Sequence, residues 1–128
     1  MGIVQPGNVA VVTGSAHGLG FGIARAAAER GMKVMLSDLD ADGLGEAVGQ
    51  LRGEGFTVEG TAANVADRDA VNVLAAATLG VFGRVDLLCN NAGIAGPTGR
   101  VDEIDPEEWD RCLDITITGQ FNVEDVND

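Results

Sequence analysis

Short apolar runs alternate with amphipathic segments from the start of the chain. Residues 8–13 form an apolar run that ends at Gly14, which predicts a strand buried on both faces. From Leu19 onward the apolar positions recur at helical spacing, and Gly31 is a natural place for that helix to stop. The first unit is therefore predicted to be a strand, a glycine-rich turn and a helix.

The alternation continues as far as residue 89. Residues 34–36 predict a second buried strand ending at Asp38, and residues 41–52 a helix that three interior glycines weaken. A third strand is predicted at residues 56–62, a third helix begins after Asp67 as its cap, and a fourth strand lies at residues 85–89. Strand and helix in alternation indicate the α/β class: a doubly wound, Rossmann-like parallel sheet with helices on both faces.

A further helix is predicted to begin at Pro106 and to fray after about residue 122. Asp105 is suited to cap it and Glu108 completes a capping box. Acidic residues crowd its carboxyl end, where the helix dipole disfavours negative charge. We therefore expect a single domain over residues 1–128 whose sheet is truncated after the fourth strand and its helix.

Composition narrows the class of partner. The net charge of -12, with one lysine in the chain, argues against nucleic acid or an anionic membrane surface as the main partner. Cys89 and Cys112 lack metal-ligand spacing, so both are expected to be reduced thiols and no metal site is predicted. Neither a membrane span nor a signal peptide is recognised, which makes a cytoplasmic location the expectation.

The glycine-rich segment at residues 13–20 lies where a dinucleotide-binding fold places the pyrophosphate of its cofactor. Gly14 permits the turn, Gly18 permits close approach of the phosphates, and Gly20 permits close packing of helix on strand. A plain tight turn in a glycine-rich chain is the alternative, and the spacing matches neither the P-loop nor the common G-x-G-x-x-G form. The position between a buried strand and an amphipathic helix favours nucleotide binding.

Asp38 ends the second strand 18 residues after Gly20, close to the roughly 20 residues expected for a carboxylate that binds the adenosine ribose. The alternative is a turn aspartate ahead of a helix. A carboxylate there would repel the 2′-phosphate of NADP by on the order of 1–4 kcal/mol per unit of phosphate charge at contact distance. NAD is therefore predicted to be preferred over NADP.

Four motifs in order make the chain resemble the short-chain dehydrogenase/reductase family. They are the glycine loop, the strand-end Asp38, the pair Asn64–Val65 and the run from Asn90 to Gly93. Residues 82–86 and 109–121 resemble the family too, so the resemblance covers nearly the whole chain. It implies an oxidoreductase acting on alcohol or ketone groups, with these cofactor-binding residues: Gly14, Ser15, His17, Gly18, Leu19, Gly20, Asp38, Leu39, Asn64, Val65, Asn91, Ala92 and Gly93.

The resemblance also implies individual roles. Asn64 stands where the family usually has an aspartate that bonds the adenine amino group, and its amide oxygen can still accept that bond. Val65 would contact the adenine, and Asn90 would brace the sheet by bonding neighbouring backbone. Ala92 and Gly93 would line the ribose next to the nicotinamide.

Departures from the family concern catalysis. The family's catalytic set is an Asn, a Ser, and a Tyr and Lys four residues apart. Thr116 occupies the position of the Asn, where the helical register of Trp109, Leu113 and Thr116 would keep it on a buried face. The chain contains no tyrosine, so the expected proton donor and acceptor for hydride transfer is missing, and no substitute is found.

Three functional hypotheses follow: an NAD-binding homologue without hydride-transfer activity as this chain alone, a truncated fragment of an active NAD-dependent oxidoreductase, and a noncatalytic oligomeric scaffold. A methyltransferase of related topology is disfavoured, because it would share the ribose-binding acid but not the run at residues 90–93. Strand order 3-2-1-4 leaves the far edge of the fourth strand unpaired. That edge and the last helix are therefore expected to bind a second copy or a partner chain.

Overall fold

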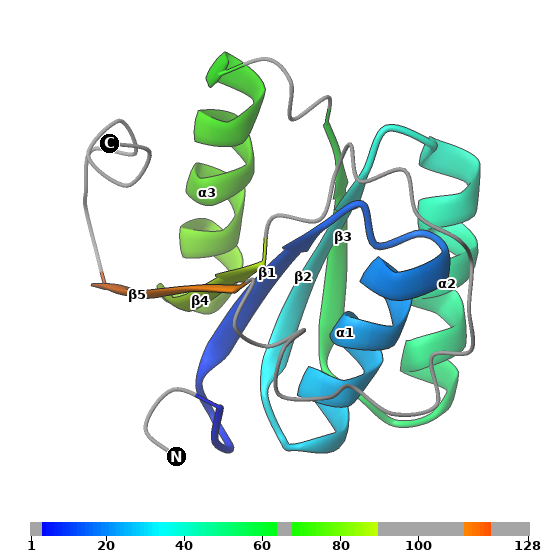
Figure 1. The fold of residues 1–128 in the computed structure, drawn as a ribbon, viewed down its shortest axis with the longest axis horizontal. Helices are drawn as coiled ribbons and strands as arrows, with labels where there is room; N and C mark the ends of the chain where they lie inside the picture. Colours follow the sequence, from blue (N-terminus) through cyan, green and yellow to red (C-terminus); the bar gives the residue numbers. More distant parts are fainter. Residues whose placement is uncertain (1–3, 64–67, 90–111, 119–128) are drawn as a thin grey trace.

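The computed structural model describes residues 4–63 and 68–89 and the segment 112–118, with backbone alone at 68–71 and 112–118. Figure 1 shows one sheet with helices on its two faces. In chain order the elements are β1 (Val9–Thr13), α1 (Gly18–Glu29), β2 (Lys33–Asp38), α2 (Ala41–Gly53), β3 (Val58–Ala62), α3 (Arg68–Phe82), β4 (Arg84–Cys89) and β5 (Cys112–Thr118).

The strand order in the sheet is β3-β2-β1-β4-β5. The first four of these strands are parallel, with Val9 opposite Lys33 and Val34 opposite Val58 at their amino ends. Helices α1 and α2 cover one face and α3 covers the other (Figure 1). Because a strand between two helical layers has no solvent-exposed side, every residue of β1 is buried, as its apolar run predicts. The doubly wound, Rossmann-like prediction is confirmed.

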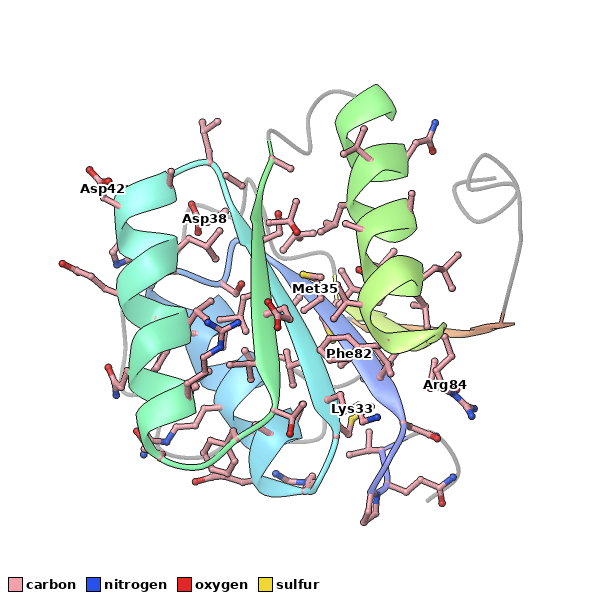
Figure 2. All side chains as sticks on the ribbon, turned by 180° about the vertical axis from the view of Figure 1, so that it is seen from behind. Lys33, Met35, Asp38, Asp42, Phe82 and Arg84 are labelled. Atoms are coloured by element: carbon pink, nitrogen blue, oxygen red, sulfur yellow. The ribbon has the colours of Figure 1, made fainter. Side chains whose placement is uncertain are left out.

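Alternate residues of β2 enter two separate cores. Val34 and Leu36 pack with the buried faces of α1 and α2, whereas Met35 packs with Leu74 of α3 on the opposite side of the sheet. Figure 2 shows Met35 beside α3 on this second face. All four side chains are at most 1 % exposed, so burial of apolar surface on both faces holds the layers together.

Helix α2 approaches β3 closely. Its start is capped by Asp40, whose side chain accepts a hydrogen bond from the Gly43 N–H at 3.0 Å. Leu44 and Val48 then face β3 at Gly60, where an added Cβ would lie 2.8 Å from Val48 Cγ2. The absence of a side chain at residue 60 therefore permits this helix–strand contact.

A buried carboxylate fastens β4 to the amino end of β1. Asp86 is 1 % exposed and accepts the backbone N–H of Val9 at 2.8 Å. The Arg84 guanidinium donates to both carboxylate oxygens, at 2.8 and 2.7 Å. Arg84 and Lys33 lie at the end of the sheet opposite Asp38 (Figure 2), so this anchor is remote from the carboxyl ends of the strands.

Residues 112–118 form a strand, which corrects the prediction of a helix across this segment. β5 pairs antiparallel with β4, with Cys112 opposite Cys89 and Thr118 opposite Arg84. Apolar residues at 113, 115 and 117 alternate with polar ones at 114, 116 and 118, and residues 115–118 are all β-branched. Both properties favour a strand. The residues predicted to start the helix, 105–108, lie outside the described part of the chain.

β5 also corrects the expectation that the far edge of β4 is unpaired. It occupies that edge along most of β4, with a register shift between Val85 and Leu87. Among the described strands the outer ones are β3 and β5. The far edge of β4 is therefore not open for self-association, because its backbone groups are already hydrogen-bonded to β5.

The expectation of two reduced thiols is wrong. Cys89 is disulfide-bonded, and the described residues include no free cysteine. Cys112 is the other cysteine of the chain and the register partner of Cys89. Spacing in the sequence did not indicate this bond, because two residues 23 positions apart become neighbours only when β5 pairs with β4.

Candidate cofactor-binding site

The glycine-rich loop leads from the carboxyl end of β1 into α1. Gly14 and Gly18 have φ values of 61° and 58°, in the left-handed region that residues with a side chain rarely adopt. Gly20 is buried on α1, where a small residue permits the helix to lie close to the sheet. The turn expected at Gly14 is therefore present, and Gly18 has a second positive φ value. Close approach of phosphates at Gly18 stays a prediction.

Ser15 joins the loop to β2. Its N–H donates to the Ser37 carbonyl oxygen at 3.0 Å, and its Oγ accepts the Ser37 N–H at 2.9 Å. The Ser15 hydroxyl also lies 2.8 Å from the Val12 carbonyl oxygen and is fully buried. The side chain of Ser15 thus holds the loop in place, and its only proton is already used within the protein.

Asp38 holds the same loop from the end of β2. Its Oδ2 accepts the Ala16 N–H at 3.0 Å, and its Oδ1 accepts the Asp40 N–H at 3.0 Å. These bonds fix both oxygens while leaving each one with further acceptor capacity. A half-buried carboxylate oriented in this way suits the two hydroxyl donors of a ribose.

The start of α1 suits an anion. His17 is the N-cap residue, its side chain makes no capping hydrogen bond, and the first turn holds no acidic residue. The first backbone N–H groups of a helix lack partners within the helix, and the helix dipole places positive charge there. A pyrophosphate beside Gly18, Leu19 and Gly20 would find donors that no capping side chain occupies.

His17 contacts the start of α2, which the sequence did not predict. Its Nε2 lies 2.9 Å from Asp40 Oδ2, and the two side chains are 66 % and 50 % exposed. The hydrogen bond with Asp40 raises the pKa of His17 above its ordinary value of 6.5, with smaller contributions from the charges of Asp40, Asp38 and Glu46. The same bond, followed by the Gly43 N–H, lowers the pKa of Asp40.

Asp40 is therefore a residue of the site that the sequence analysis missed. The available signal was local: an aspartate directly before a predicted helix is a strong N-cap candidate. That signal identifies the cap, but not the histidine from another element that the carboxylate also binds.

The other predicted site residues differ in how far the structure describes them. Leu39 is 71 % exposed next to Asp38, and Leu19 is half-buried at the start of α1. Thr116 lies in the middle of β5, where the backbone alone is described. The remaining ones lie outside the described residues: Asn64, Val65, Asn90, Asn91, Ala92 and Gly93.

The described residues thus fit the adenosine and pyrophosphate portions of a dinucleotide. The loop at residues 14–20 would hold the pyrophosphate, and Asp38 would hold the ribose. When bound, such a cofactor supplies a hydride acceptor or donor. No group of three metal-ligating side chains occurs among the described residues, and none of the described helices is long and apolar enough to cross a membrane.

Comparison with known proteins identifies the family of the chain. The family model described as short chain dehydrogenase matches residues 8–125. A D-threitol dehydrogenase from Mycolicibacterium smegmatis is 39% identical over 115 residues, which cover 90% of this chain and 44% of that protein. The chain thus spans less than half the length of this curated relative.

Solved structures agree in fold and differ in cofactor. A short-chain dehydrogenase/reductase from Burkholderia phymatum in complex with NAD is 39% identical, with a TM-score of 0.66 over 69% of this chain and 31% of that chain. An actinorhodin polyketide ketoreductase variant with NADPH is 34% identical, with a TM-score of 0.66 over 80% of this chain and 39% of that chain. The chain therefore belongs to the short-chain dehydrogenase/reductase family of oxidoreductases.

Proposed function

We propose that this chain binds NAD in preference to NADP, as the cofactor-binding part of an oxidoreductase acting on alcohol or ketone groups. The observation that carries the proposal is the Asp38 carboxylate, which two backbone N–H groups orient beside the glycine-rich loop. A carboxylate in this position accepts hydrogen bonds from the ribose hydroxyls and repels a 2′-phosphate.

The surroundings of Asp38 support the choice of NAD. Asp40 lies two residues farther along the chain, and its backbone N–H donates to Asp38 Oδ1 at 3.0 Å. Two carboxylates at the end of β2 favour an uncharged hydroxyl over a doubly charged phosphate, because like charges raise the free energy of the bound state. Relatives of this chain have been solved with NAD and with NADPH. Membership of the family therefore does not determine the preference, and the proposal rests on the local charges.

Further cofactor contacts belong to the proposal. By resemblance to the family, the Asn64 amide would accept a bond from the adenine amino group and Val65 would contact that ring. Asn91, Ala92 and Gly93 would line the ribose next to the nicotinamide. These residues follow β3 and β4, whose carboxyl ends lie at the same edge of the sheet as the glycine-rich loop.

Catalysis is a separate part of the proposal. The chain has no tyrosine. By resemblance to the family, Thr116 would take the position of the catalytic asparagine. We expect these 128 residues alone to bind NAD without transferring hydride. The alternatives are an active oxidoreductase to which this chain contributes the cofactor half, and a noncatalytic scaffold that has lost the nucleotide.

Isothermal titration calorimetry of the 128-residue chain with NAD and NADP tests the cofactor proposal. We expect saturable NAD binding and NADP binding at least about fivefold weaker, the factor that corresponds to about 1 kcal/mol of repulsion. Absence of NAD binding, or tighter binding of NADP, would contradict it. Incubation with NAD and a panel of secondary alcohols, followed at the absorbance of NADH, tests the expected lack of turnover.

Self-association and a cytoplasmic location are also proposals. With β4 paired to β5, the support for a homo-oligomer is now the exposed apolar side chains of Val73 and Val81 on α3, which are 60 % and 52 % exposed. Size-exclusion chromatography with light scattering tests it, and a monomer at high concentration would contradict it. Disulfides are uncommon in reducing compartments, so the disulfide of Cys89 is an observation against a cytoplasmic location. The redox state of Cys89 in cells tests the location, and a disulfide there would contradict it.

A further inference from the structure

We propose that Asp40 is a positioning residue for the cofactor: acting through His17, it clamps the glycine-rich loop to the start of α2 and makes NAD affinity depend on pH. We call the contact between these two side chains the His17–Asp40 clamp. The proposal rests on NAD binding by the chain and adds to it a residue and a regulation that the cofactor contacts alone do not contain.

The geometry joins three elements at one point. His17 is the N-cap of α1, and its Nε2 lies 2.9 Å from Asp40 Oδ2. Asp40 uses its other oxygen, Oδ1, to cap α2 through the Gly43 N–H at 3.0 Å. The backbone N–H of Asp40 in turn donates to Asp38 at the end of β2. Through these bonds one residue, Asp40, connects the loop, the ribose-binding carboxylate and the start of α2.

Gly43 leaves the space that the clamp needs. A Cβ at residue 43 would lie 2.5 Å from Asp40 Oδ2 and 2.6 Å from His17 Nε2, distances that real Cβ atoms do not tolerate. Elsewhere in the same helix, a Cβ at Gly45 or Gly49 would meet nothing within 4 Å. The close fit is thus specific to the residue that lies against the clamp.

The charges around His17 set the direction of the pH effect. Asp38 from β2 and Asp40 and Glu46 from α2 all favour the imidazolium, and the hydrogen bond with Asp40 is the largest cause of its raised pKa. The positive end of the α1 dipole acts in the opposite direction. Protonated His17 makes a charge-assisted hydrogen bond to Asp40 and adds positive charge beside the proposed pyrophosphate position. Both contributions are lost when His17 deprotonates, so NAD affinity falls as the pH rises.

The expected size is modest because the clamp is exposed. We expect NAD affinity to fall about fivefold, and within about three- to tenfold, between the protonated and neutral forms of His17, as for one solvent-screened charge near an anion. By linkage, NAD binding must raise the pKa of His17 by the logarithm of the same factor. NAD has no group of its own that titrates in the neutral range.

Two measurements on the 128-residue chain test this together. His17 is the only histidine, so its imidazole gives a single set of NMR signals whose titration reports its pKa with and without NAD. Calorimetry at a series of pH values gives the NAD affinity. We expect the midpoint of the affinity change to match the measured pKa of His17, and His17→Gln to abolish this change.

Asp40→Asn separates positioning from stability. Asparagine caps a helix as well as aspartate does, so the start of α2 is preserved, but the negative charge on the clamp is lost. We expect the pKa of His17 to fall and the midpoint of the affinity change to move to lower pH with it. A role in stability alone would lower the melting temperature of Asp40→Asn without moving that midpoint.

Gly43→Ala with Gly45→Ala as its matched control tests the geometry without changing any charge. Both changes favour helix formation to a similar degree. We expect Gly43→Ala to lower the pKa of His17 and to weaken NAD binding at low pH, whereas Gly45→Ala leaves both unchanged. Equal behaviour of the two variants would overturn the proposal.

The outcomes distinguish this proposal from the one on which it rests. Absence of NAD binding at every pH would refute the cofactor proposal itself. NAD binding whose affinity is independent of pH, or whose pH dependence persists in His17→Gln, would refute the clamp while leaving cofactor binding intact. The NMR titration also reports on the clamp without cofactor, because an unshifted His17 pKa in Asp40→Asn would show that the two side chains do not interact.

Discussion

The Asp38 carboxylate accepts a hydrogen bond from the backbone N–H of Ala16 at 3.0 Å, across 22 positions of sequence. The bond ties the carboxyl end of β2 to the loop that follows β1. One side chain therefore serves two purposes in the proposed site: it holds the loop in the shape that a pyrophosphate requires, and it presents acceptors to the ribose.

Asp38→Ala is expected to weaken NAD binding about 10- to 100-fold, because hydrogen bonds to a charged group contribute about 1.5–3 kcal/mol and the loop loses its tie to β2. NADP binding should weaken less, which narrows the preference for NAD. Calorimetry measures both affinities. Asp42→Ala is the matched control, since it removes one exposed carboxylate from the first turn of α2 (Figure 2) without breaking a bond to the loop. Equal losses in the two variants would contradict the specific role of Asp38.

Asp86→Ala is expected to destabilise the protein by about 2–3 kcal/mol, measured by urea unfolding. The change leaves the buried N–H of Val9 without its acceptor and deprives Arg84 of its partner. Glu59→Ala is the comparison, because the Arg52–Glu59 ion pair has a similar distance of 2.7 Å but is exposed, and such pairs contribute about 0–1 kcal/mol. A loss for Asp86→Ala no greater than that for Glu59→Ala would show that burial of the carboxylate has little effect.

Gly60→Ala is expected to destabilise the protein by about 1–3 kcal/mol, although glycine is normally the poorer strand residue. The added Cβ would overlap Val48 Cγ2 at 2.8 Å and approach Leu44 Cγ at 3.3 Å, so the Val48 side chain or α2 itself must shift. Gly49→Ala on the open side of α2 should instead stabilise by up to about 1 kcal/mol. Thermal and urea unfolding of the two variants measure these opposite signs, and stabilisation by both would contradict the packing argument.

The His17–Asp40 clamp also predicts how stability depends on pH. Because the pKa of folded His17 is raised above 6.5, its contribution is complete below that value and is lost as the pH rises through the raised pKa. Because the pKa of Asp40 is lowered below 3.8, its contribution is present above that value and is lost as the pH falls through the lowered pKa. The difference in melting temperature between the wild type and His17→Gln should therefore be greatest between these two values. A difference that does not vary with pH would contradict this.

The pattern of apolar and polar residues within short segments was sufficient to predict the parallel strands and the helices between them. The apolar runs of β1, β2 and β4 and the helical spacing of α1 appear in the sequence because the burial of each element follows from its position in the sheet. Gly14, Gly18 and Asp38 were identified in the same way, since positive φ values and strand-end carboxylates follow from residue type and position. These are properties of short segments, and short segments can be interpreted without the rest of the chain.

Tertiary structure decided what depends on partners distant in sequence. Residues 112–118 fit a helical register but also have the alternation and β-branched residues of a strand. They form strand β5 because β4 offers an edge to pair with, and that edge is not visible in the segment itself. The pairing brings Cys112 opposite Cys89, just as the meeting of α1 and α2 brings His17 to Asp40. The sequence by itself thus determined the βα units and the glycine-rich loop with its carboxylate. Only the folded chain decided the antiparallel edge, the disulfide and the clamp, because each joins residues whose proximity arises from packing and not from spacing.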